Sequence, residues 1–311
     1  MDLLLEHSIQ LTIKMKDENK IVIISPVRNE FNHFPKTIDS MLRQSLKPIQ
    51  WIIVDDGSTD NTWELIKDLN KKYSWIFPLK KEDRGSRIVG PGVVESFYFG
   101  FEYIKDKNYE FICKMDGDIM FQHTYFSKLI SYFDNDKYLG AASGKPFIRK
   151  GKSLVEERTN NEMVCGQINF YKKKCFEEIG GFVKEVHWDA IAFHRARMSG
   201  WRTKSINDTN LNFIHLRVMG SSHKSIVHGR LRWGKGQYFL GTHPLYLIFI
   251  ALYRSVEYPF VIGGLCIIIG YCKAALKRMR RYEYLNFRKS LHAWQLERLC
   301  LARRLEKIPD K

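Results

Sequence analysis

The chain has 311 residues, of which 44% are hydrophobic and 14% aromatic, which is enough for a large packed core and excludes a disordered chain. Its net charge of +16 requires an anionic partner or surface, and at this point nucleic acid and anionic lipid are both candidates. Residues 1–20 carry Asp2 and Glu6 beside only three consecutive leucines, so we expect an N-terminal extension that is not a signal peptide. The six cysteines form no Cys-x-x-Cys pair, which favours reduced core thiols over disulfides or zinc.

Short apolar runs alternate with amphipathic segments from residue 21 onward. The expected strands are 21–25, 51–54, 76–79, 111–115, 166–171 and 202–206. Apolar residues at helical spacing predict helices over 34–42, 63–73, 93–104 and 189–198. Strands and helices that alternate through short loops predict an α/β fold with a doubly wound, mostly parallel sheet and helices on both faces.

The strand 111–115 ends at two carboxylates, Asp116 and Asp118, with one glycine between them. Open α/β sheets bind ligands at the carboxyl ends of their strands. Two carboxylates on one tight turn repel each other unless a cation lies between them, and such oxygen ligands suit Mg²⁺ or Mn²⁺, which can hold a diphosphate. The alternative is an Asx-type turn that caps the helix expected near Thr124.

Motifs for other nucleotide folds are missing from the sequence. No Gly-x-Gly-x-x-Gly follows the first strand and no P-loop motif occurs, so a dinucleotide dehydrogenase and a P-loop ATPase are disfavoured. Phosphate charge must then be met by a metal ion and by arginines. Arg84 and Arg87 follow the third strand, where they are either a donor contact or a solvated face.

Three motifs together resemble the family 2 glycosyltransferases of GT-A fold, of the membrane-associated type. The motifs are residues 23–30, 53–62 and 115–118, and the resemblance covers about residues 21–238. It implies a GT-A catalytic domain over 21–238. It also implies an inverting transfer of a sugar from a nucleoside diphosphate sugar to a hydroxyl acceptor.

The resemblance also implies roles for single residues. Residues that would bind the nucleotide sugar are Pro26, Arg28, Glu30, Asp55, Arg84 and Asp116. Family members often have an aromatic residue where Arg28 stands. Asp116 and Asp118 would meet the donor through a divalent cation, Mn²⁺ or Mg²⁺, with Asp118 the direct ligand. We interpret Asp60 as a cap of the following helix.

Two further candidates lie late in the chain. In the family, the helix on the acceptor side commonly starts with Glu-Asp, and this Asp is the candidate catalytic base. Here Trp188 stands in place of the Glu, so the resemblance assigns the base to Asp189 alone. The alternative role of Asp189 is structural, since a negative charge at the start of a helix interacts favourably with the helix dipole. His215 matches the late histidine that many GT-A enzymes use as a metal ligand, and its alternative is a structural histidine.

Residues 229–233 resemble the Gln-x-x-Arg-Trp box of processive family members, but Gly229 stands where Gln belongs. This difference argues against an enzyme that adds many sugars in succession.

Residues 239–311 form the expected C-terminal helical, membrane-associating region. Residues 258–272 carry no charge, yet a full span needs about 20 apolar residues. From Lys273 to Lys311 there are twelve Lys/Arg against four Asp/Glu, so 12 − 4 = +8. We expect two short helices that lie in or dip into the cytoplasmic leaflet, with the tail on anionic headgroups and no nucleic acid bound. A single span and a buried helical hairpin remain alternatives.

The sequence thus predicts a glycosyltransferase of cell-envelope glycan synthesis with a glycan or lipid-linked acceptor. One alternative is a sugar-phosphate nucleotidyltransferase, which usually carries a glycine-rich, basic loop after the first strand. The other is a non-catalytic membrane or nucleic-acid binding protein on the same fold.

Overall fold

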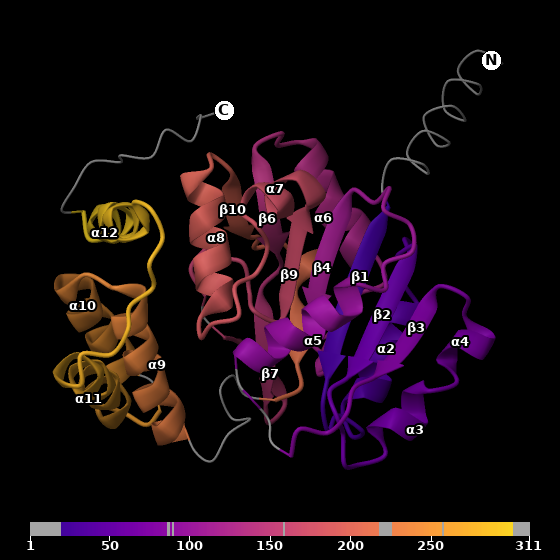
Figure 1. Cartoon of the computed structure of the whole chain (residues 1–311), viewed down its shortest axis with the longest axis horizontal. Helices are drawn as coiled ribbons and strands as arrows, with labels where there is room; N and C mark the ends of the chain where they lie inside the picture. Colours follow the sequence, from indigo (N-terminus) through magenta and orange to yellow (C-terminus); the bar gives the residue numbers. More distant parts are fainter. Residues whose placement is uncertain are drawn as a thin grey trace.

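The computed structural model describes residues 20–85, 88, 90–157, 159–217, 226–256 and 258–300. A seven-stranded sheet in the order β10–β6–β9–β4–β1–β2–β3 forms its centre (Figure 1). Its strands are β1 (Ile21–Val27), β2 (Gln50–Asp55), β3 (Ile76–Lys80), β4 (Phe111–Met115), β6 (Leu139–Ser143), β9 (Ile168–Lys172) and β10 (Arg202–Ser205). Neighbours run parallel except at β9, which is antiparallel to β4 and β6.

Helices cover both faces of this sheet, as the doubly wound prediction requires. They are α2 (Phe34–Leu42), α3 (Thr62–Ile66), α4 (Leu69–Lys72), α5 (Pro91–Phe101), α6 (Tyr125–Asp134), α7 (Lys173–Glu178) and α8 (Trp188–Met198). Alternate residues of β1 enter different cores: Ile23 packs with α2 and α6, whereas Ile24 packs with α5. The single helix expected over 63–73 is instead two short helices, interrupted between Ile66 and Leu69.

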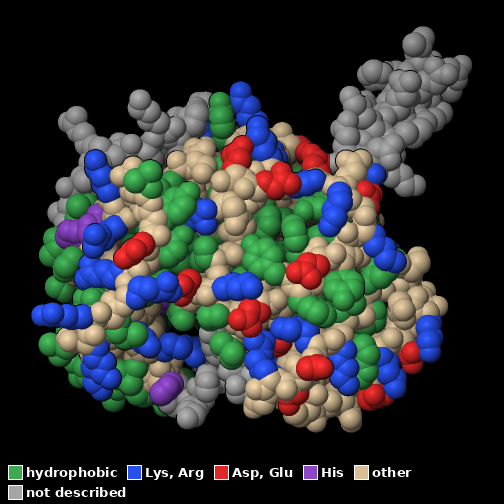
Figure 2. Space-filling view, in the orientation of Figure 1, with side chains coloured by type: hydrophobic (Ala, Val, Ile, Leu, Met, Phe, Trp, Pro, Cys, Tyr) green, Lys and Arg blue, Asp and Glu red, His purple; other side chains and the backbone are tan. Residues whose placement is uncertain are grey.

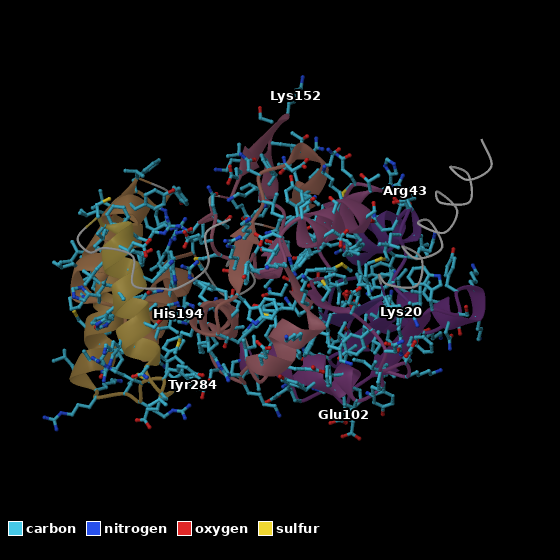
Figure 3. The ribbon with its side chains drawn as sticks, turned by 90° about the horizontal axis from the view of Figure 1, so that it is seen from above. Lys20, Arg43, Glu102, Lys152, His194 and Tyr284 are labelled. Carbon is cyan, nitrogen blue, oxygen red and sulfur yellow. The ribbon has the colours of Figure 1, made fainter. Side chains whose placement is uncertain are left out.

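A second, four-stranded sheet lies beside the first and was not predicted. Its order is β5–β11–β7–β8, from β5 (Ile119–Phe121), β11 (Phe213–His215), β7 (Pro146–Lys150) and β8 (Ser153–Glu156). Lys152, at the turn between β7 and β8, projects away from the rest of the molecule (Figure 3). The pairing of β11 with β5 places His215 opposite Ile119, next to the acidic turn after β4.

Four C-terminal helices form a separate layer beside α8, at the left of Figure 1. They are α9 (Ile226–Leu240), α10 (Pro244–Ser255), α11 (Ile262–Leu276) and α12 (Phe287–Arg298). Helix α9 packs along α11, and the predicted domain boundary after residue 238 falls in the last turn of α9. In the part of the chain that the structure describes, no helix combines the length and hydropathy needed to cross a bilayer.

Helix α12 completes the core next to α8. Its Phe287 and Trp294 pack with Ile191 and Phe193 of α8, and the His194 ring lies 5.1 Å from that of Phe287, centre to centre. Figure 3 shows His194 at the boundary between the sheet and the C-terminal helices. A truncation before α10 would therefore expose part of the core, and point substitutions are the better test of this region.

Candidate active site

The acidic turn after β4 is held by close packing and by a threonine. A Cβ atom at Gly117 would lie 2.8 Å from Cγ1 of Val27, so only glycine fits between the turn and β1. The Thr37 hydroxyl of α2 lies 2.9 Å from the Gly117 carbonyl and 2.7 Å from the Ile119 carbonyl. These contacts fix the positions of Asp116 and Asp118 on either side of Gly117.

Asp118 is buried and paired with two cations, one from the last residue of β11 and one from the segment that follows it. Its Oδ2 atom accepts a hydrogen bond from Nε of Arg217 at 2.8 Å and lies 3.5 Å from Nε2 of His215. Arg217 also pairs with the buried carboxylate of Glu30, in the loop after β1. Burial alone would raise the pKa of Asp118, but His215 and Arg217 hold it well below its usual range.

His215 lies between two carboxylates. Its Nδ1 atom is 2.8 Å from Oε2 of Glu157, and its Nε2 atom faces Asp118. Burial alone would lower the pKa of His215, but Asp118 and Glu157 outweigh burial and raise it to about 9. Glu157 was not predicted from the sequence, since one glutamate in a polar stretch carries no signal. No role was predicted for Arg217 either, although that residue stands two positions after His215.

Asp116 points to a different cation. Its carboxylate pairs with Nζ of Lys114, a buried residue of β4 that also donates to the Gly166 carbonyl at 2.9 Å. The ammonium of Lys114 lies 5.3 Å from the ring centre of Trp188. Lys114 was also missed, and its signal was available: a lysine inside an apolar strand needs a partner when buried.

A divalent cation fits one pair of these side chains. Ligands about 2.1 Å from one octahedral ion lie about 3 Å apart, close to the 3.5 Å that separates Oδ2 of Asp118 from Nε2 of His215. Carboxylate oxygen and neutral imidazole nitrogen are both donors that Mn²⁺ accepts, so His215 would have to release its proton on binding the ion. Asp116 is engaged by Lys114, and within the described ranges no group of three or more His, Cys, Asp or Glu side chains is placed to hold a metal.

Asp55 ends β2 as a fully buried carboxylate. Its Oδ1 atom accepts the backbone N–H of Ser58 at 2.9 Å, and Oδ2 has no hydrogen-bond partner among the residues described. Burial raises the pKa of Asp55. Pro26 pairs with Val54 at the neighbouring end of β1. An unpaired buried acceptor at this edge of the sheet needs a donor from elsewhere, such as an N–H of a bound base.

The two arginines predicted for the nucleotide are held by protein carboxylates. Arg28 donates to the Asp56 carbonyl and, at 2.7 Å, to Oδ1 of Asp83. Arg84 pairs with Asp56 and, at 2.6 Å, with Oε2 of Glu95. Arg87 lies outside the described residues. The roles of Arg28 and Arg84 at the nucleotide stay predictions.

Asp60 accepts the backbone N–H of Thr62, the first residue of α3, at 2.9 Å. It therefore caps the start of that helix, as the sequence indicates.

Asp189 lies in the first turn of α8, across β9 from the acidic turn. Its Oδ1 atom accepts the N–H of Ala190 at 2.9 Å, and a Cβ atom at Gly166 would lie 3.0 Å from its Oδ2. The Asp116 N–H bonds the carbonyl of Gln167 at 2.8 Å, next to Gly166. The fold thus brings Asp116, Asp118, Asp189 and His215 to one edge of the sheet, with Glu30 and Asp55 beside them.

The family model for glycosyl transferase family 2 matches residues 22–197, which span every motif in this site up to α8. The chain belongs to glycosyl transferase family 2. The sheet with its switch in strand direction at β9 carries the family motifs at the carboxyl ends of β1, β2 and β4.

The chain is also similar to bacterial poly-β-1,6-N-acetyl-D-glucosamine synthases. A poly-β-1,6-N-acetyl-D-glucosamine synthase of Staphylococcus aureus (strain MSSA476) is 23% identical over 271 residues, which cover 80% of this chain and 61% of the relative. The chain therefore spans less than two thirds of that protein.

Solved structures show the fold. A mannosyltransferase from Pyrobaculum calidifontis, in complex with GDP-Man and Mn²⁺, has a TM-score of 0.52 and 16% identity, covering 92% of this chain and 76% of the other. Staphylococcus aureus TarS, in complex with UDP-GlcNAc, has a TM-score of 0.52 and 12% identity, covering 91% and 84%. These likenesses confirm the GT-A prediction for the fold.

Residues 229–233 on α9, which resemble the Gln-x-x-Arg-Trp box, take part in packing. Arg254 of α10 lies 4.9 Å from the ring centre of Trp233, and Arg230 lies 5.5 Å from the same ring. A non-processive enzyme, as Gly229 indicates, stays a prediction.

Proposed function

We propose that this chain is an inverting glycosyltransferase that moves a sugar from a nucleoside diphosphate sugar to a hydroxyl acceptor, in the synthesis of a cell-envelope glycan. One observation carries the proposal: Asp118 pairs with His215 at the turn after β4, and Asp189 lies against Gly166, next to the Gln167 carbonyl that bonds the N–H of Asp116. Family membership favours it over a nucleotidyltransferase or a non-catalytic binding protein.

The donor site follows from the loops after β1 and β2. Oδ2 of Asp55 would accept an N–H from the base, and Pro26, Arg28 and Glu30 would surround the nucleoside. Uracil and guanine both present a ring N–H to such an acceptor. Because TarS is solved with UDP-GlcNAc and the bacterial relative is an N-acetylglucosamine polymer synthase, UDP-GlcNAc is the first donor to test.

Asp118 and His215 would hold a divalent cation, with Asp116 adding negative charge beside them. A bound Mn²⁺ or Mg²⁺ supplies positive charge that stabilises the leaving diphosphate. Arg217, which contacts Asp118 and Glu30, would add a positive charge of the chain's own beside the ion. Glu157 would orient the His215 ring through Nδ1, as carboxylates commonly do for metal-binding histidines.

Asp189 is the proposed general base. It would take the proton of the acceptor hydroxyl while that oxygen bonds to the anomeric carbon, and the bond from that carbon to the diphosphate oxygen breaks on the opposite face. The nucleoside diphosphate leaves with the electron pair, and the anomeric configuration inverts. The test is to incubate the full chain with UDP-GlcNAc, Mn²⁺ and a saccharide acceptor and to determine the new linkage by NMR. A product of retained configuration contradicts the proposal.

Gly166→Ala offers a separate test of the base. The new Cβ would lie 3.0 Å from Oδ2 of Asp189, so the carboxylate must shift by a few tenths of an ångström. A misplacement of this size lowers the transfer rate by about tenfold, because reaction requires close alignment. Nucleotide affinity should stay unchanged, since Asp55 lies on another strand. The transfer rate and the affinity for UDP should be measured on the same preparation of the variant. An equal loss of both would contradict an effect of Gly166→Ala that acts through Asp189.

The C-terminal helices would attach the enzyme to the cytoplasmic leaflet. Helix α10 exposes Leu245 and Leu252, which lie seven residues apart on one face of the helix and are each half exposed or more. The segment leading into α11 adds large apolar side chains that are 53–70% exposed: Tyr258, Phe260, Val261, Ile262 and Leu265. Lysines and arginines are interleaved with hydrophobic side chains over this part of the surface (Figure 2). Exposed apolar area on this scale favours a membrane surface over the alternative of a hairpin fully buried in the protein.

Liposome binding tests this attachment. We expect firm binding to anionic liposomes, weaker binding to neutral ones, and partial loss at high salt, since both apolar burial and charge contribute. Phe260→Glu with Leu252→Glu should abolish most of the binding. Leu154→Glu is the matched control, because Leu154 is 49% exposed on β8, away from these helices. Equal binding of all variants would contradict the assignment of the surface, and labelling of the tail near Lys311 from outside the cell would contradict its sidedness.

A further inference from the structure

A groove of about 510 Å³ lies between the loop before β9 and helices α10 and α12. We propose that it binds the saccharide chain of the acceptor at a distance from the reacting hydroxyl, which deepens the proposed function and rests on it. Its lining includes Asn160, Asn161, Glu162, Tyr246, Phe249 and Arg298. This groove is separate from every residue assigned above to the donor, the cation or the base.

The polar side chains of the groove are already fixed in place. Glu162 accepts hydrogen bonds from Trp294 at 2.8 Å and pairs with Arg197 at 2.9 Å and Arg298 at 3.0 Å. The Asn160 oxygen accepts from Arg298 at 2.9 Å, and the Asn161 oxygen accepts from Lys145 at 2.7 Å. Because these bonds orient both amides before binding, little conformational entropy is lost when a ligand arrives.

The groove chemistry suits a saccharide. With their oxygens engaged, the asparagines have NH₂ groups that make no hydrogen bond to any residue the structure describes, and these can donate to sugar hydroxyls. The rings of Tyr246 and Phe249 are stacked, 6.3 Å apart between centres, and Phe249 is 49% exposed. Such a pair offers a flat apolar surface for the C–H face of a pyranose ring. A lipid chain would leave the NH₂ groups of both asparagines without hydrogen-bond partners.

Helix α8 connects the groove to the proposed base. Asp189 lies in its first turn, and Arg197, which contacts Glu162, lies in its last. Eight residues separate them, which corresponds to about 12 Å along the helix. A single sugar at Asp189 cannot reach the groove across that distance. The geometry therefore points to an acceptor that is an oligosaccharide, with its growing end at Asp189 and earlier sugars on the aromatic pair.

The test uses β-1,6-linked N-acetylglucosamine acceptors, from the monosaccharide to the hexasaccharide, with the full chain and UDP-GlcNAc. We expect KM for the longer acceptors to be lower than for the monosaccharide by about tenfold or more. Phe249→Ala should remove this gain, because loss of the ring costs about tenfold in binding. Ile248→Ala is the matched control, as Ile248 is 50% exposed on the same helix and does not line the groove. UDP affinity should be the same in all three proteins.

A hexasaccharide that carries a photoreactive diazirine gives a readout independent of activity. We expect cross-links to residues 159–162 or 246–249 in the wild-type chain and in Ile248→Ala, and fewer in Phe249→Ala. The inference is wrong if KM does not depend on acceptor length, if Phe249→Ala keeps the gain, or if cross-links fall elsewhere. Absence of UDP-GlcNAc turnover with any acceptor, while the diazirine probe still labels the groove, would instead reject the proposed donor chemistry.

Discussion

Asp118→Asn should lower turnover of the nucleotide sugar by about 100-fold or more, in line with the loss of one catalytic electrostatic contact. The substitution keeps the shape of the side chain and an acceptor for Nε of Arg217, which lies 2.8 Å from Oδ2. The substitution removes the negative charge of Asp118, which faces His215 and would face a bound cation. Steady-state rates with Mn²⁺, Mn²⁺ affinity by electron paramagnetic resonance, and the unfolding temperature together separate a catalytic loss from a folding defect.

Asp68→Asn provides the control for this experiment. Asp68 is an exposed carboxylate paired with Lys71, remote from the crevice, and its substitution should leave turnover unchanged. Wild-type rates in Asp118→Asn would contradict the cation site, as would rates unaffected by EDTA in the unmodified protein.

Asp189→Asn should abolish transfer to the acceptor and leave the affinity for the nucleoside diphosphate nearly unchanged. The amide oxygen of asparagine can still accept the N–H of Ala190, so the start of α8 is preserved. What is lost is the ability to take a proton, which general-base catalysis requires and which contributes about 10²–10⁴-fold. The measurements are acceptor-dependent product formation and UDP binding by calorimetry.

Asp208→Asn is a control matched to Asp189 in local structure. Asp208 accepts the backbone N–H of Asn210 at 2.9 Å at the start of a short helix, as Asp189 accepts that of Ala190, and its other oxygen accepts from Tyr132, which has no proposed catalytic role. Transfer should persist in this variant. If Asp189→Asn loses nucleotide binding as much as transfer, Asp189 serves the helix start and the base must be sought elsewhere.

The first half of the sheet follows from local sequence patterns. The apolar runs at 21–25, 51–54, 76–79 and 111–115 are strands β1–β4. Those of β1, β2 and β4 are buried, because a strand covered on both faces needs an almost unbroken apolar run, whereas β3 lies at the edge of the sheet and is only partly buried. The prediction of one continuous helix over 63–73 was wrong. Apolar spacing shows which face of a helix is buried, but it does not show whether the backbone stays helical throughout. The polar loops after β1 and β2 lie at the same edge as the acidic turn, as parallel pairing requires.

The second sheet could not be predicted in the same way. Strands β5 and β11 have three residues each, which is too short for a periodic signal. They pair although about 90 residues of chain separate them, and that pairing is decided by long-range packing. The groove beside α10 likewise depends on α12 packing on α8, since its lining comes from three separate segments.

The sequence alone determined which charged residues stand at the strand ends. Asp55, Asp116 and Asp118 each follow an apolar strand, and Asp189 opens a helix, so their places at the edge of the sheet followed from local patterns. Which cation meets which carboxylate was settled only by the tertiary structure. Lys114 pairs with Asp116, and Arg217, which lies about 100 residues away in the chain, pairs with Asp118. The physical reason is that a buried charge must be paired, and its partner is whichever side chain the packed strands bring within reach.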